Sequence, residues 1–339
     1  MIFILLTRAH DYTVQHYLET WGRDARGTVT TIHYEDLAFG ARLRPGTYIF
    51  SDLERLNDAQ LELAKLAWRT MAARPDGFRL LNDPSEALRR YELLKTLHAD
   101  GINGFQAYRL NNGRLPEKFP LFLRRESEHD GAISPLLHSR AELDRAVEES
   151  LARGVRRDDL LAVEFCDTAD AAGVYRKYSA FRVGDQIIAR HALFSRKWVV
   201  KVPDETEQQW VDEERDYLAA HPHEAALRKV FDLAHIDYGR VDYSLLEGRI
   251  QVWEINTNPT ISVAPHKLAA GRLVAQQMFM KQLRSAWEVL DLKNDATPAE
   301  LCVPRELARR LNVNPLRRSR RALARGIKWL AKRPFIQNA

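Results

Sequence analysis

The sequence predicts an α/β protein with an N-terminal open parallel sheet, a two-lobed α+β unit and a basic helical tail. Three observations favour this architecture. Short apolar strands alternate with helices over residues 1–82, which is typical of parallel strands joined by helices. Two hairpin patterns follow, at 175–195 and 240–256. Residues 305–339 contain eleven Lys or Arg residues and a single acidic residue, Glu306.

The N-terminal unit begins with the apolar run Ile2–Leu6, which is typical of a buried strand. Asn57, followed three residues later by Gln60, forms a capping box that opens a helix. Further strands are expected at 29–33, 47–50 and 80–81, and a helix at 12–21.

Start signals and turns also divide the rest of the chain. Asp83, Pro84 and Glu86 are typical of a helix start, and that helix is expected to end at Gly101. Ser139 is expected to cap a helix. The other expected elements are strands at 105–110, 120–125 and 160–166, hairpins at 175–195 and 240–256 that turn at 184–185 and 247–248, two helices within 206–236, and a helix at 267–290.

Composition excludes several classes of protein. No uncharged apolar run approaches the ~20 residues that a membrane-spanning helix needs, and residues 1–7 lack the basic start of a signal peptide. The two cysteines, Cys166 and Cys302, lie in no metal-binding cluster. We therefore expect a cytoplasmic protein.

Charge is distributed unevenly along the chain. The net charge is +5, but residues 305–339 carry +10, which leaves −5 for residues 1–304. Nucleic acid is therefore not an expected partner of the body. Apolar residues at one helical spacing within 316–333, surrounded by basic ones, predict an amphipathic helix. Such a helix suits an anionic membrane surface or nucleic acid, and equally a position on the acidic body of the protein with its basic face in solvent.

The hairpin at 240–256 carries the strongest chemical signal. Glu254 and Asn256 lie on one face of a strand because side chains alternate with a period of two. The turn at 247–248 places Asp242 opposite residues 253–254. Two carboxylates and a carboxamide, without His or Cys, predict a site for Mg²⁺, with Mn²⁺ as the alternative metal. The competing interpretation is a solvated polar face of the hairpin.

Gly239-Arg240-Val241-Asp242, followed by Glu254-Ile255-Asn256-Thr257-Asn258-Pro259, resembles the signature of the ATP-grasp superfamily. The resemblance is to members such as D-alanine–D-alanine ligase and the glutamate ligases. It implies that Asp242, Glu254 and Asn256 hold Mg²⁺ on the phosphates of ATP. Arg240 would be the catalytic residue that faces the transferred phosphoryl group. The resemblance further implies four parts: an N-terminal domain at 1–82, a small lobe with a lid at 83–165, a second lobe with the metal site at 166–295, and the tail at 296–339.

The resemblance weakens upstream. Arg90 and Arg124 occupy positions where the family carries phosphate-binding lysines, Glu164 matches the strand-end glutamate of the adenine site, and Lys177 is the favoured cation on its strand. For the arginines the alternative is a surface ion pair, and for Glu164 a position in solvent. The expected lid, 125–131, has one glycine and three acids where many members are glycine-rich, which implies a different lid or impaired turnover.

The leading functional hypothesis is an ATP-dependent ligase that joins a small-molecule carboxylate to an amine or similar nucleophile. The alternatives are a kinase on the same scaffold and a non-catalytic ATP-binding module targeted by its tail. Residues 257–266 are expected to shape the acceptor pocket, with Thr260, Ser262 and His266 as polar candidates. Arg190, Lys197 and Lys201 either serve an anionic substrate or lie in solvent. A homodimer is common among related folds.

Overall fold

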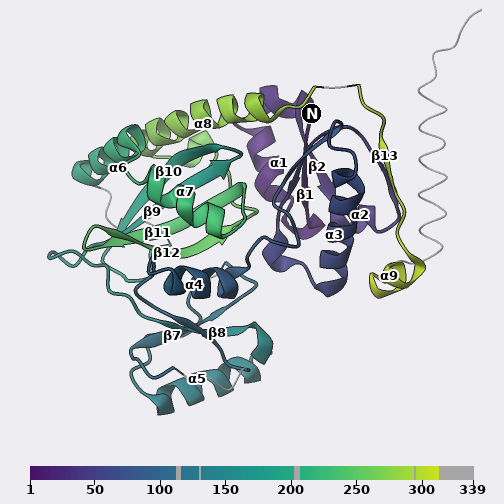
Figure 1. The fold of residues 1–339 in the computed structure, drawn as a ribbon. Coiled ribbons are helices and arrows are strands. Elements are labelled where there is room, and N and C mark those ends of the chain that lie inside the picture. The colour runs from purple at the N-terminus through teal and green to yellow at the C-terminus, as the bar shows by residue number, and fades with distance from the viewer. Residues whose placement is uncertain (112–115, 130, 202–206, 294, 313–339) are drawn as a thin grey trace, which may run out of the picture.

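The computed structural model describes residues 1–111, 116–129, 131–201, 207–293 and 295–312. The basic helix predicted at 316–333 lies outside these residues. An N-terminal unit stands beside a larger sheet, a small lobe lies below that sheet, and the long helix α8 runs across the first two (Figure 1). Within the part of the chain that the structure describes, no helix combines the length and the apolar character needed to cross a membrane.

A parallel sheet forms the N-terminal unit, as predicted. Its strand order is β2-β1-β4-β5, and every neighbouring pair is parallel. β1 is buried along its whole length, which explains its unbroken apolar sequence. The strands are β1 (Ile2–Leu6), β2 (Val29–His33), β4 (Gly46–Phe50) and β5 (Phe78–Leu81), and the helices are α1 (Tyr12–Glu19), α2 (Tyr34–Leu37) and α3 (Asp58–Ala72).

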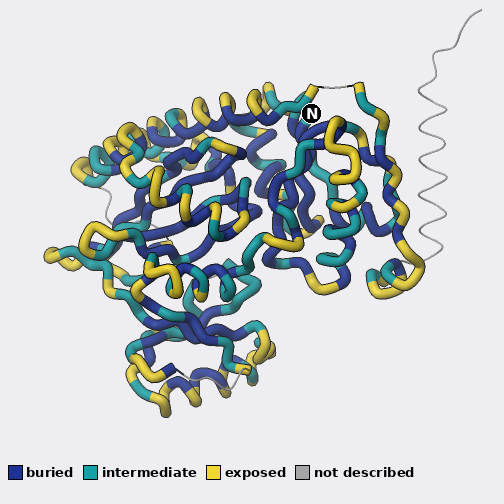
Figure 2. Tube along the Cα trace, viewed as in Figure 1, coloured by how far each residue is buried: buried dark blue, intermediate teal, exposed yellow. Residues whose placement is uncertain are grey.

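Helix α8 (Ala270–Leu290) packs against both the N-terminal unit and the larger sheet. Its Phe279, Leu283 and Trp287 share one core with Ile4 of β1 and Phe181 of the larger sheet. Its outer side is exposed while the strands beneath it are buried (Figure 2). The chain then returns to the N-terminal unit, where β13 (Ala299–Leu301) pairs with β3 (Ala41–Leu43) and is followed by α9 (Arg305–Arg310).

The small lobe is a three-stranded sheet with the order β6-β8-β7, covered on one face by α5. Leu121 and Leu123 face α5, so Phe122 and Arg124 face the opposite side, toward the larger sheet. Ser139 caps α5, as predicted. The elements are β6 (Ala107–Arg109), β7 (Leu121–Arg125), β8 (Leu160–Glu164) and α5 (Arg140–Ala152).

The larger sheet is antiparallel, with the order β10-β9-β11-β12, and both predicted hairpins are confirmed. Two β-bulges interrupt it, one at Arg190 and one at Trp253, because neither residue has a partner in the register of its strand. Its strands are β9 (Tyr175–Val183), β10 (Gln186–Ser195), β11 (Tyr238–Leu246) and β12 (Arg249–Asn256), and its helices include α6 (Gln208–Ala220) and α7 (Glu224–Leu233).

The helix predicted to start at Asp83 is shorter than expected, because α4 spans Arg90–Ala99. Asp83 and Glu86 instead form a turn, in which the Asp83 carbonyl and carboxylate accept from nearby backbone N–H groups. The N–H of Leu88 donates to the carbonyl of Ala234, the residue that follows the last turn of α7. Since that donor is used in a tertiary contact, the helix begins only after it. Five short 3₁₀ helices complete the described elements: η1 (Arg8–His10), η2 (Arg23–Gly27), η3 (Leu53–Arg55), η4 (Arg157–Asp159) and η5 (Pro265–Lys267).

Candidate active site

The hairpin β11–β12 brings together the three side chains singled out by the sequence. Asp242 pairs directly with Glu254, and Arg240 pairs with Asn256. Residues opposite each other in an antiparallel pair project from the same face, as do residues two apart on one strand. Asp242, Glu254 and Asn256, which we call the oxygen cluster, therefore share one face of the sheet, and Arg240 lies beside them. All three members of the cluster are buried.

Cations surround the carboxylate of Glu254. One of its oxygens accepts from Nη2 of Arg90 at 2.7 Å and from Nη2 of Arg124 at 2.6 Å. The other oxygen lies 3.4 Å from Nδ1 of His129. Burial acts to raise the pKa of Glu254, but the charges of Arg90 and Arg124 outweigh it and hold the pKa well below its usual value. The side chain is therefore a carboxylate at neutral pH.

Asp242 has its own set of partners. Nε of Arg240 donates to it at 2.8 Å, the hydroxyl of Ser179 donates to it at 2.7 Å, and Nζ of Lys177 lies 3.4 Å away. Burial opposes ionisation, yet the charges of Arg240 and Lys177 lower the pKa of Asp242 below its usual value. The same Ser179 hydroxyl lies 2.9 Å from Nε2 of His191, so a fixed hydrogen-bond chain orients Asp242.

A loop of the small lobe closes over the oxygen cluster. Nη1 of Arg90 donates to the carbonyls of Arg125, Glu126 and Glu128, at 2.9, 2.6 and 2.6 Å. His129 extends from this loop and lies between two carboxylates, because its Nε2 is 2.8 Å from Glu54 of the N-terminal unit. The predicted lid is thus held by arginine and histidine side chains.

The pKa values of this bridge reflect the pairing. Burial acts to lower the pKa of His129, but Glu254 and Glu54 outweigh it and raise the pKa above 6.5. Burial acts to raise the pKa of Glu54, but His129 and the hydroxyl of Thr257 lower it to about 2. The bridge therefore places His129 between two carboxylates and connects the N-terminal unit, the lid and the oxygen cluster.

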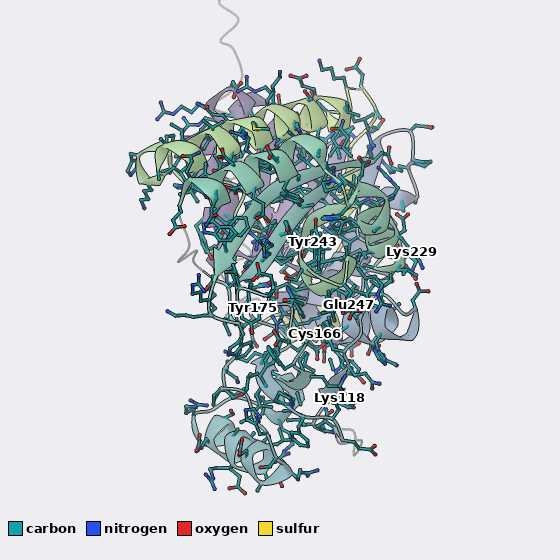
Figure 3. The ribbon with its side chains drawn as sticks, turned by 90° about the vertical axis from the view of Figure 1, so that its left-hand side faces the viewer. Lys118, Cys166, Tyr175, Lys229, Tyr243 and Glu247 are labelled. Atoms are coloured by element: carbon teal, nitrogen blue, oxygen red, sulfur yellow. The ribbon has the colours of Figure 1, made fainter. Side chains whose placement is uncertain are left out.

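An aromatic cavity lies between the small lobe and the larger sheet, next to the oxygen cluster. The ring of Trp198 lies 5.0 Å from that of Phe122 and 5.8 Å from that of Phe165. Cys166 and Tyr175, at the level where the lobe meets the sheet, also line the cavity (Figure 3). Arg124, Lys177, Asp242 and Glu254 form its polar end. The cavity therefore joins an aromatic region to a charged one.

Glu164 is not brought into this cavity. Alternation on β8 directs its side chain to the α5 side of the small lobe, together with Leu160 and Ala162. There its carboxylate accepts from the hydroxyl of Tyr108 at 2.9 Å and from the N–H of Gln106 at 3.1 Å. Its neighbour Phe165 lines the cavity instead.

The loop after β12 is bound to the N-terminal unit. The N–H of Asn258 donates to Asn256 at 2.8 Å, and its side chain accepts from Thr13 at 2.7 Å. Thr257 is hydrogen-bonded to Ser51 and Glu54. Of the polar residues expected to shape an acceptor pocket here, Thr260 and His266 are exposed and Ser262 is buried.

The side chains of the oxygen cluster and the cations around it fit a divalent metal ion and phosphate groups. The oxygen cluster offers only oxygen atoms, the donor set that Mg²⁺ prefers. Within the described ranges, no group of three or more His, Cys, Asp or Glu residues could hold a metal ion, so a third protein ligand would be the carboxamide of Asn256. Arg90, Arg124, Lys177 and Arg240 outnumber the two carboxylates they contact, and this excess positive charge suits a polyphosphate.

Several residues of the site carried no local signal in the sequence. Glu54 lies in the short helix η3 and His129 in a loop, 75 positions apart, and they meet only through the tertiary fold. Ser179 could have been found, because it lies two residues after Lys177 on β9 and so shares its face. His191 faces the same side because the bulge at Arg190 shifts the alternation of β10.

No family model and no curated protein matches the chain. Solved structures are similar to it in fold. An L-amino acid ligase from Bacillus licheniformis aligns with 86% of this chain and 74% of its own, at 11% identity and a TM-score of 0.42. A D-alanine–D-alanine ligase from Helicobacter pylori aligns with 87% of this chain and 99% of its own, at 10% identity and 0.46. A RimK domain ATP-grasp protein from Sphaerobacter thermophilus aligns with 83% and 98%, at 12% identity and 0.42. The likeness to these structures is one of fold.

Proposed function

We propose that this protein is an ATP- and Mg²⁺-dependent ligase that activates a small-molecule carboxylate for attack by an amine or similar nucleophile. One observation carries the proposal: two buried carboxylates, Asp242 and Glu254, lie side by side, each already ionised and each paired with more than one cation. Such a site binds a divalent metal and a polyphosphate by exchanging internal ion pairs for external ones. The names of the similar structures agree with this class of reaction.

The nucleotide would lie in the aromatic cavity. Phe122, Phe165 and Trp198 offer aromatic rings on which a base could stack, and Arg124 and Lys177 lie at the charged end of the cavity. In this arrangement the triphosphate would reach the oxygen cluster with its terminal group nearest Arg240. Arg90, which holds the lid carbonyls, would couple closure of the lid to occupation of the phosphate site.

Asp242, Glu254 and Asn256 would hold Mg²⁺, which neutralises charge on the transferred phosphoryl group. Arg240 projects from the same face, and it would orient the substrate carboxylate and stabilise the acyl-phosphate formed from it. Ser179 and His191 fix the position of Asp242, and the lid with His129 would keep water from the acyl-phosphate. A nucleophile would then attack the acyl carbon and release phosphate.

Hydroxylamine tests this proposal directly, because it converts an acyl-phosphate into a stable hydroxamate. We expect one or more members of a panel of amino acids, peptides and small carboxylates to give Mg²⁺-dependent release of ADP together with a hydroxamate. ADP release with a stable phosphate ester and no hydroxamate would identify a kinase. Nucleotide binding with no turnover on any member of the panel would favour the non-catalytic ATP-binding module.

A further inference from the structure

Arg190 is a buried arginine without a carboxylate partner. Its side chain is 6% exposed, and among the described residues no Asp or Glu lies within ion-pair distance of it. Two carboxylates are near enough to affect it, Glu214 and Asp242, but each is already bound by another arginine, Arg272 and Arg240 respectively. Burial, together with the charges of those two arginines, lowers the pKa of Arg190 to about 9.

The backbone directs this arginine toward the candidate active site. Arg190 is the extra residue of the bulge on β10, between Ala189, which pairs with Ala180, and His191, which pairs with Ser179. Bulges are common beside active sites, where they redirect a side chain. The guanidinium rests on the ring of Phe279, 4.7 Å from its centroid, at the inner face of α8. Solvation of the strand, the alternative for Arg190, is therefore excluded.

Two more unsatisfied polar groups belong to the same region. Nη2 of Arg190 donates to Oε1 of Gln276 at 2.8 Å, and the N–H of Val263 reaches the same oxygen at 3.4 Å. Ser262 immediately precedes Val263 in the loop that follows the oxygen cluster. Ser262 and Gln276 are 1% and 2% exposed. In the described part of the chain, Nε of Arg190, Nε2 of Gln276 and Oγ of Ser262 have no hydrogen-bond partner.

Unsatisfied donors on a buried cation are costly unless a ligand pairs with them. Here the donors are a guanidinium, a carboxamide N–H and a hydroxyl, all fixed by strand, helix and loop. A planar guanidinium matches a carboxylate through two parallel hydrogen bonds. Arg124 and Lys177 already stand at the charged end of the nucleotide cavity, whereas Arg190 lies toward α8 and the loop of the acceptor side.

We propose that Arg190, Ser262 and Gln276 form a binding subsite for a second carboxylate of the substrate, one that is not activated. The inference rests on the proposed function. It specifies the substrate class, because a single ligand that reaches both Arg240 and this subsite carries two acidic groups. Amides and esters at that position would bind poorly.

The test uses the full-length protein with Mg²⁺ and a non-hydrolysable ATP analogue, and measures thermal unfolding while malonate, succinate or glutarate is added. We expect at least one dicarboxylate to stabilise the wild type more than its monoamide does. Arg190→Met should weaken its apparent affinity on the order of 10- to 100-fold, the usual effect of losing charged hydrogen bonds. Arg190→Lys and Ser262→Ala should give smaller losses. Arg284→Gln, an exposed arginine on the same helix as Gln276, is the matched control and should change nothing.

The unfolding temperature without added dicarboxylate separates a binding role from a structural one. If Arg190 serves a ligand, Arg190→Met should be as stable as the wild type or more stable, because it removes a buried unpaired charge. A large loss of stability in Arg190→Met would overturn the proposal. So would equal shifts of the unfolding temperature in wild type and variant with every dicarboxylate, or no shift in either protein. Absence of stabilisation by the nucleotide itself would instead count against the proposed function. If Arg190→Met changed only the affinity for the nucleotide, Arg190 would belong to the phosphate site, and the proposal would also be overturned.

Discussion

Asp242 on β11 and Glu254 on β12 are directly opposite each other in the antiparallel pair, one residue from the bulge at Trp253. Their carboxylates are shared among Arg90, Arg124, Lys177 and Arg240. Without ligands, the groups that would bind metal and the groups that would bind phosphate neutralise one another. Binding of Mg²⁺ and ATP together would replace these ion pairs, whereas either ligand alone would leave charges of one sign unpaired.

Removing either carboxylate should abolish turnover. We expect Asp242→Asn and Glu254→Gln each to lower Mg²⁺-dependent ADP release at least about 100-fold, since changing a residue that only orients a metal ligand already costs 10- to 100-fold. Glu254→Gln should also destabilise the fold by about 1–3 kcal/mol, because two buried arginines lose their anionic partner. Glu247→Gln, in the exposed turn of the same hairpin, is the control. Near-normal turnover in either variant would refute the metal assignment.

Arg240 should act on the chemical step. Arg240→Ala is expected to lower kcat on the order of 100- to 1000-fold, as does the loss of one donor to a developing negative charge, while the KM for ATP changes little. Arg240→Lys should recover part of the rate, because it keeps the charge but not the two-pronged hydrogen bonding. Steady-state kinetics with saturating Mg²⁺ gives both constants. A large rise in KM with unchanged kcat would place Arg240 in the nucleotide site instead.

The aromatic cavity should determine nucleotide affinity. Trp198→Ala removes the ring that contacts both Phe122 and Phe165. Stacking of a base on an aromatic ring contributes about 1–3 kcal/mol, so we expect the Kd for ATP to rise roughly 5- to 150-fold by calorimetry. Trp198→Phe should retain most of the affinity. An unchanged Kd in Trp198→Ala would mean that the base binds elsewhere.

The bridge through His129 should make stability depend on pH on the alkaline side. The pKa of His129 is raised above 6.5 in the folded state, so its contribution is complete below pH 6.5 and is lost as the pH rises through the folded value. Urea unfolding of ligand-free wild type should therefore show a decrease in unfolding free energy above pH 6.5 that is missing from His129→Gln. His138→Gln, at an exposed position, should behave like the wild type. Parallel curves for wild type and His129→Gln would disprove the bridge.

Much of the fold was predictable because its signals are local. The hairpin with Asp242 and Glu254 follows from strand alternation and a turn at Glu247-Gly248, and the Asn57–Gln60 capping box is formed as expected. Local sequence signals gave wrong boundaries where tertiary contacts determine the end of an element. Helix α4 starts six residues after Pro84, because Leu88 bonds to Ala234.

The parts of the candidate site that escaped prediction depend on long-range geometry. His129 lies in a loop and Glu54 in the short helix η3, and no spacing in the sequence links them. The bulge at Arg190 changes which β10 side chains face the site, and a bulge has no reliable sequence signal. Glu164 shows the reverse case: its motif suggested the nucleotide, but the alternation of β8 places it on the α5 face.

The most direct test of the account is to locate the metal. Crystals grown with Mn²⁺ and a non-hydrolysable ATP analogue should give anomalous difference peaks at about 2.0–2.3 Å from oxygens of Asp242, Glu254 and Asn256, with Arg90 and Arg124 turned from Glu254 toward phosphate. Peaks at other side chains, with the ion pairs of Glu254 and Asp242 unchanged beside a bound nucleotide, would contradict it.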